Sequence, residues 1–166
     1  MQEIFMRRSI RQYLPQPIEK EKIERLLRAA MQAPSAGNQQ PWEFIVTEEK
    51  AQLQKLSLLS PYAGPVKGAA AAFVLLGNEK QMKFPENWQM DMAAAAENIL
   101  LESVHLGLGA VWLGVAPLQE RMEYIKAFYS LPDFIRPFGV IALGYPAADP
   151  GFIDRYDAAR VHYNQY

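Results

Sequence analysis

The stretch WQMDMAAAAENILLESVHLGL, residues 88–108, is the longest run in the chain with a helical pattern. Its four consecutive alanines, Ala93 to Ala96, have small side chains on every side, so a second helix or a ligand can approach closely. A glycine at position 107 or 109 is placed to cap the helix end. Directly after it, the apolar stretch 110–115 predicts a strand that runs into a loop. Helix and strand together indicate a fold of mixed α and β structure.

The same pattern analysis extends to both ends of the chain. Helices are predicted over 2–7, 18–31, 48–59 and 118–129, and strands over 43–47, 69–76 and 138–145. In the helix over 18–31, apolar residues repeat at helical spacing with charged residues between them, and Pro34 stops the pattern. We find no internal repeat, low-complexity tract or linker. The prediction is one domain over 1–166.

The tail, residues 147–166, has almost no periodic pattern but is rich in aromatic residues. It is too long and too aromatic for simple disorder. We therefore expect an arm that packs on another surface, that of a second subunit.

Composition excludes several classes of protein. Half of the 166 residues are apolar, the net charge is −1 and the charges are mixed, so nothing indicates a nucleic-acid partner. The absence of cysteine excludes disulfides, thiolate metal sites and cysteine nucleophiles, and it fits a cytoplasmic protein. No secretory signal is visible, and the longest apolar run, 69–76, is far shorter than the ~20 residues of a membrane span. The two histidines lie far apart, so no metal site is expected.

The first candidate site is Arg7-Arg8-Ser9-Ile10-Arg11. Guanidinium groups match phosphate oxygens, and a serine hydroxyl can bond a sugar or polyol. If the segment is helical, its three arginines share a face. Taken alone, the run is better explained as a solvated basic surface.

Polar side chains of turn-forming residues make a second candidate in the loop from Pro34 to Trp42. Ser35, Asn38 and Gln40 supply donors and acceptors, and amides can bond the edge of a heterocycle. A third candidate is the stretch Trp112 to Val115, because Gly114 in an apolar segment permits close approach of a ligand. Arg155 in the tail is a second candidate for a phosphate. The alternatives are a plain surface loop for 34–42, an ordinary buried strand with a bend for 112–115 and a solvated charge for Arg155.

Five blocks in this order resemble the shorter members of the FMN-dependent nitroreductase family. They are 7–11, 33–42, 95–101, 106–114 and 160–164. The resemblance implies an α+β fold with a central, mostly antiparallel sheet flanked by helices. It also implies a domain-swapped homodimer with exchanged C-terminal arms, in which two FMN molecules lie at the interface and each touches both chains.

The resemblance also implies a role for each candidate. Arg7 and Arg155 hold the FMN phosphate, and Arg8 and Ser9 the phosphate or ribityl chain. Arg11 lies beside N1 and the C2 carbonyl of the ring, where a cation stabilises the reduced flavin. The partner chain lines the ring with Pro34, Ser35, Ala36, Asn38 and Gln40. On the other side of the ring lie backbone groups of Trp112, Leu113, Gly114 and Val115, with the Gly114 N–H near N5 or O4. No side chain is assigned as a catalytic acid or base, and no metal is expected.

Three departures from the family pattern affect this assignment. Lys67 is the one candidate for a further basic residue near the ring. Ile153 stands where many members carry a lysine. The lid segment, 78–89, is short.

The implied activity is that of an oxidoreductase in which NADH or NADPH reduces FMN, and a nitroaromatic, quinone or similar flat acceptor is then reduced in ping-pong order. Three alternatives remain at this point. They are a reductase with a dedicated metabolic substrate, a flavin-binding protein with storage or regulatory duty, and a phosphate-binding module without flavin.

Overall fold

The computed structural model describes residues 2–148 and 151–166. Its sheet has four strands in the order β1-β2-β4-β3, and every neighbouring pair is antiparallel. The strands are β1 (Trp42–Thr47), β2 (Ala71–Asn78), β3 (Gly109–Gly114) and β4 (Ile135–Gly144). The α-helices are α1 (Glu3–Met6), α2 (Lys20–Met31), α3 (Lys50–Leu56), α4 (Trp88–His105) and α5 (Gln119–Tyr129). Short 3-10 turns are Ala36–Asn38, Gly64–Gly68, Glu79–Gln81, Pro85–Asn87 and Ala158–Arg160.

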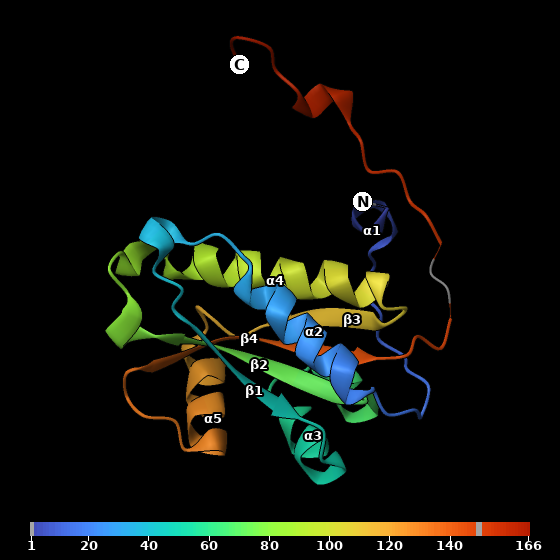
Figure 1. The fold of residues 1–166 in the computed structure, drawn as a ribbon, viewed down its shortest axis with the longest axis vertical. Coiled ribbons are helices and arrows are strands. Elements are labelled where there is room, and N and C mark those ends of the chain that lie inside the picture. Colours follow the sequence, from blue (N-terminus) through green and yellow to red (C-terminus); the bar gives the residue numbers. More distant parts are fainter. Residues whose placement is uncertain (1, 149–150) are drawn as a thin grey trace.

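Helices cover both faces of the sheet (Figure 1): α2 and α4 lie on one face, and α3 and α5 on the other. Strand β2 is buried along its whole length, which is why its sequence is a continuous apolar run. Its side chains alternate between the two cores: Phe73 and Leu75 face α2 and α4, whereas Val74 and Leu76 face α3 and α5. The predicted α+β fold with an antiparallel sheet flanked by helices is confirmed.

The long helix ends where its sequence indicates. Leu106 is the C-cap of α4, and Gly107 follows with φ +71°, a left-handed conformation that glycine adopts without strain. A second helix does approach the alanine run, since the Asn98 side chain donates to the Ala29 carbonyl of α2 at 2.9 Å. Ala95 and Ala96 are fully buried there.

Most elements differ from the predicted ranges by one to three residues at an end. Helix α3 ends at Leu56 rather than at residue 59. Strand β4 begins at Ile135, three residues before the predicted start, and contains Pro137. The proline is tolerated because β3 pairs with β4 only from Gly139 onward, and because a bulge between Leu75 and Leu76 shifts the β2 register beside it.

The arginine-rich segment is not helical. Helix α1 ends at Met6, Arg7 is extended, and Ser9 forms a parallel bridge with Ala110 at the free side of β3. The Ile10 N–H donates to the Ala110 carbonyl at 2.9 Å. The condition for one helical arginine face is therefore not met, because pairing with β3 extends the chain.

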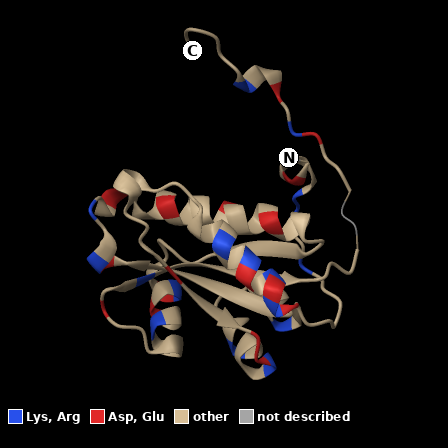
Figure 2. Ribbon diagram, in the orientation of Figure 1, with Lys and Arg blue, Asp and Glu red and all other residues tan. Residues whose placement is uncertain are grey.

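The C-terminal arm leaves the body of the molecule (Figure 1). Its large apolar side chains are exposed, including Phe152 at 57% and Tyr163 at 80%. Residues 149 and 150, which fall within the arm predicted over 147–166, lie outside the described residues. In this view, Lys and Arg mix with Asp and Glu along the outer helices (Figure 2).

Candidate functional site

A hollow of about 470 Å³ opens at the end of strand β3. Pairing of the N-terminal segment with β3 brings Arg11 to its edge, beside the backbone of Trp112, Leu113 and Gly114. The other lining residues are Ser60, Tyr62, Pro65, Val111 and Arg121. A Cβ built on Gly114 meets no atom within 4 Å, so this backbone faces open space. Predicted residues from two distant parts of the sequence therefore meet at one place.

A smaller hollow of about 260 Å³ adjoins the first, because Arg11 lines both. Its other lining residues are Ser9, Ile10, Gln12 and Ala148. The Ser9 side chain is exposed here. We refer to these two neighbouring hollows together as the groove, and Arg11 lies between them.

Val115 lies just beyond the groove and is fully buried. Its N–H donates to the Phe138 carbonyl at 3.2 Å, so the sheet already uses this donor. Trp112 is half-buried, and its ring packs on Phe138 with the ring centroids 5.5 Å apart.

Arg7 and Arg8 are half-buried beside helix α1. The Arg7 guanidinium is 3.7 Å from the Glu97 carboxylate. Arg8 donates to the carbonyls of Phe5 and Arg7, at 3.0 and 2.7 Å. Its Nε is buried with no hydrogen-bond partner, an uncommon state for a charged donor.

Arg8 also connects the N-terminal segment to the arm. Its Nη2 donates to the Ile153 carbonyl at 3.2 Å. Arg155 follows two residues later and is exposed. Two extended residues span at most about 7 Å, so the arm carries Arg155 past the N-terminal arginines.

Helix α1 is fixed to the end of α4 by Glu3, whose carboxylate lies 3.0 Å from His105 Nδ1. Hydrogen bonds from its own backbone N–H and from His105 lower the pKa of Glu3 to about 2. Contacts among described residues thus give His105 a structural role, and no described group of His, Asp or Glu has the arrangement of a metal site.

The polar loop after α2 does not line the groove. Pro34, Asn38 and Gln40 are exposed, and Ser35 and Ala36 are half-buried. The Ala36 N–H donates to Asp91 at the start of α4, whereas Glu3 contacts the end of α4 at His105. Asp91 and His105 are about 21 Å apart along the helix axis. Figure 1 shows α1 and this loop at opposite ends of α4. One chain therefore does not bring this loop to its own arginines.

A buried hydrogen-bond network shapes that loop. Asp91, 5% exposed, accepts hydrogen bonds from the Ala36 N–H at 2.8 Å and from the Gln39 side chain at 2.6 Å. Gln39 also exchanges hydrogen bonds with the backbone of Phe84, and the Ser35 hydroxyl accepts from the Gln40 N–H. Gly37, Asn38 and Gln40 all have positive φ.

Sequence reasoning missed three residues here. Asp91 and Gln39 build the loop network, and Arg121 contacts the Gly114 carbonyl at 2.8 Å. A signal existed for Asp91, since it is an acidic residue followed directly by the apolar face of α4. No sequence signal indicates Arg121, because its position in the pattern is that of an ordinary charged residue on the outside of a helix.

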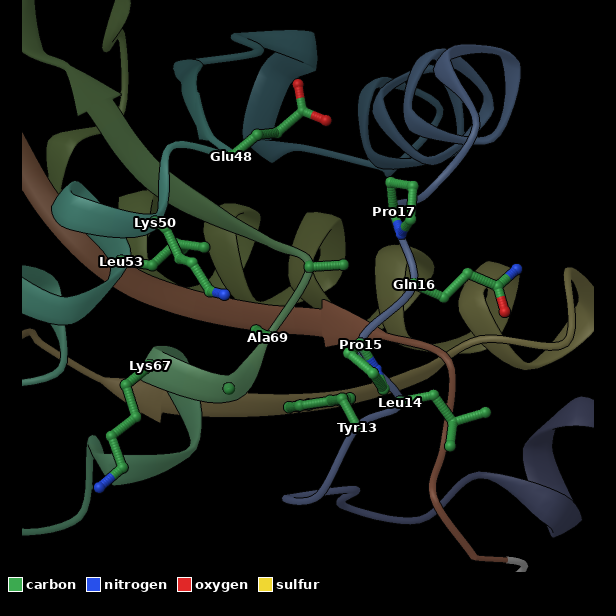
Figure 3. A pocket seen from close by; sticks show the side chains of 12 residues that line it. Tyr13, Leu14, Pro15, Gln16, Pro17, Glu48, Lys50, Leu53, Lys67 and Ala69 are labelled. Carbon is green, nitrogen blue, oxygen red and sulfur yellow. The ribbon is translucent and has the colours of Figure 1, made fainter.

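Lys67 does not line the groove. It comes from the turn Gly64–Gly68 and borders a separate hollow of about 450 Å³ with Tyr13, Pro15 and Lys50 (Figure 3). The turn separates the two hollows, since Pro65 lines the groove and Lys67 the other side.

The sequence of this chain is similar to those of known proteins. The model of the nitroreductase family matches residues 4–87 and 60–145. The chain belongs to the nitroreductase family. Among family members, a protein of Methanothermobacter thermautotrophicus with the provisional name NADH dehydrogenase/NAD(P)H nitroreductase is 42% identical over 166 residues, covering 100% of this chain and 87% of the relative.

Two solved structures extend the comparison. One, provisionally named an NADH oxidase, comes from Clostridium acetobutylicum; it is 57% identical with a TM-score of 0.97 and covers 99% of both chains. The other, from Desulfovibrio desulfuricans, is a provisional nitroreductase in complex with FMN. It is 28% identical with a TM-score of 0.86 and covers 99% of this chain and 96% of that chain. The predicted resemblance to the nitroreductase family is confirmed. No helix among the described residues is long and apolar enough to cross a bilayer.

Proposed function

We propose that this nitroreductase-family chain is an FMN-dependent NAD(P)H oxidoreductase, which reduces nitroaromatic, quinone or similar flat acceptors in ping-pong order. The observation that carries the proposal is the meeting of Arg11 with the open backbone of Gly114 in one hollow. When bound, FMN would supply the ring nitrogen that takes hydride from NADH or NADPH and passes it on to the acceptor. The chain itself contributes placement and charge.

The groove fits FMN chemically. No described residue that lines its two hollows is Asp or Glu, and Arg11 lies where they join. Arg8 lines a neighbouring hollow that shares Ile10 and Ala148 with the groove, and an anion that reached its buried, unpartnered Nε would satisfy that donor. In this proposal Arg7, Arg8 and Arg155 bind the phosphate, Ser9 the ribityl chain, and Arg11 the N1 and C2 edge of the ring. Trp112 to Val115 lie against the ring, with Gly114 allowing the closest approach.

A homodimer completes the proposed site. Pro34, Ser35, Ala36, Asn38 and Gln40 would come from the partner, since α4 separates them from the arginines of their own chain. The arm 147–166 would pack on the partner, which would cover apolar side chains that one chain leaves exposed. The single domain 1–166 then forms half of a two-site assembly, and a chain without cysteine suits a reducing cytoplasm.

The test is an anaerobic titration of the purified protein with NADH and NADPH, followed by flavin absorbance. We expect a yellow dimer that is bleached rapidly by at least one nicotinamide and reoxidised by a nitroaromatic or quinone. A colourless monomer that does not bind added FMN contradicts the proposal. A yellow protein that both nicotinamides bleach only slowly is not a reductase.

A further inference from the structure

Arg121 lies in the groove at a position that no pattern in the sequence indicated. It belongs to the first turn of α5, and its Nη1 donates to the carbonyl of Gly114, seven residues earlier, at 2.8 Å. This contact fixes a guanidinium group at the end of β3, beside the backbone that faces the hollow.

Most of the donors on this guanidinium are uncommitted. Arginine presents N–H donors in a planar fork, and the Gly114 carbonyl uses one side of it. Among the described residues, nothing else accepts a hydrogen bond from Arg121 or forms an ion pair with it. The side chain is half-buried, so its charge is only partly screened by water.

The charge of the hollow has one sign. Arg11 and Arg121 both line it, and none of its described lining residues is acidic. A concave site with two cations favours a negatively charged occupant. Under the proposed function Arg11 is assigned to the flavin ring, which leaves Arg121 as the cation for the second flat ligand.

We propose that Arg121 selects acceptors that carry an anionic group on a flat ring, such as a carboxylate or an acidic phenol, and binds that group directly. This inference rests on the proposed function. A carboxylate matches the guanidinium fork with two parallel hydrogen bonds. The contact with Gly114 holds the fork in place before the ligand arrives, which lowers the entropic cost of binding.

Benzoate and benzamide test the proposal, because they have nearly the same shape and differ in charge. Calorimetry on the FMN-loaded protein gives both dissociation constants without turnover. We expect benzoate to bind roughly five- to tenfold more tightly than benzamide, as for a charge-assisted hydrogen bond in a half-exposed site. Arg121→Gln should abolish this ratio, and Arg121→Lys should lower it at least twofold because the fork is lost.

Lys126→Gln is the matched control, since it removes the same charge from the same helix outside the hollow. This variant should keep the wild-type ratio. In turnover, Arg121→Gln should raise KM for 4-nitrobenzoate but not for 4-nitrobenzamide.

Three outcomes overturn the inference. One is a wild-type protein that does not distinguish acid from amide. Another is Arg121→Gln that weakens both ligands equally, because that result indicates a purely structural role. If Arg121→Gln does not fold, an unchanged ratio in Arg121→Lys is decisive in the same way. An FMN-loaded protein with any of these results overturns this inference alone, whereas a protein that cannot bind FMN overturns the proposed function and this inference with it.

Discussion

The side-chain amide of Gln39 donates a hydrogen bond to the buried carboxylate of Asp91, 2.6 Å away, and so ties the loop after α2 to the first turn of α4. The second oxygen of Asp91 accepts from the Ala36 N–H. Both polar partners lose their acceptor if the carboxylate is removed. Because the proposed dimer places this loop on the flavin of the partner, its shape links the folding of one chain to cofactor binding by the other.

Asp91→Ala should therefore destabilise the protein and weaken FMN binding together. Loss of a buried, fully bonded carboxylate leaves two unsatisfied donors, and we expect a decrease of about 2–4 kcal/mol in the free energy of unfolding. Urea denaturation and FMN titration measure the two effects. Glu86→Gln, an exposed carboxylate in the segment before α4, is the control and should change neither.

Substitutions at two glycines of β3 distinguish an effect on stability from an effect on FMN binding. A Cβ on Gly114 meets nothing within 4 Å, so Gly114→Ala should change stability by less than about 0.5 kcal/mol while lowering FMN affinity. A Cβ on Gly109 would lie 2.7 Å from atoms of the Ile10 side chain, so Gly109→Ala should cost about 1–3 kcal/mol. Thermal unfolding and FMN titration of both variants check this. Equal FMN affinity in Gly114→Ala and the wild type would place the ring elsewhere.

Arg11→Ala tests the assigned contact with the flavin ring. A fixed cation near N1 and the C2 carbonyl stabilises the reduced, negatively charged form. The variant should keep some FMN, and its two-electron potential should fall by roughly 30 mV, which corresponds to about 1.4 kcal/mol. Equilibrium titration against a reference dye measures the potential. An unchanged potential would remove Arg11 from the ring.

The parts of the fold that follow from local patterns could be predicted from the sequence. The capping of α4 at Gly107 and the continuous apolar run of β2 depend only on neighbouring residues. The early start of β4 could not be predicted, because Pro137 argues against a strand unless the bulge beside it is known. Helical periodicity likewise predicted the helix over 118–129 but could not show that Arg121 turns back to Gly114.

The candidate site divides in the same way. Arginine, glycine and amide residues were singled out by their chemistry, and the structure brings Arg11 and Gly114 into one hollow. Asp91 was missed because its partners lie more than fifty residues earlier, with separations of 55 for Ala36 and 52 for Gln39. A contact at such a distance follows from how α2 and α4 cross, which one sequence does not specify.

Arg155→Ala tests the role assigned to the arm. Arg8 contacts the Ile153 carbonyl, so the arm passes the N-terminal arginines, and a phosphate there would gain a charge-assisted bond from Arg155. The variant should bind FMN roughly tenfold more weakly or worse. Arg160→Ala, whose guanidinium pairs with Asp157 in the same arm, is the control. Unaltered affinity in Arg155→Ala would show that the tail arginine is not a phosphate ligand.

Tyr13 fixes the segment that carries Arg11, and its ionisation predicts a pH dependence of stability. The phenol donates to the carbonyls of Ile10 and Ala142, at 2.7 and 3.1 Å, and burial raises its pKa above the ordinary value. A raised folded-state pKa means that this contribution to stability is complete below pH ~10 and is lost as the pH rises further.

Tyr13→Phe should lower the free energy of unfolding by about 1 kcal/mol at pH 7 and should show a shallower decline above pH ~10. Urea denaturation from pH 7 to 11 measures both, with Tyr62→Phe, an exposed tyrosine outside the arm, as control. A decline as steep in Tyr13→Phe as in the wild type would assign the alkaline loss to another group, such as Tyr129, whose pKa burial also raises.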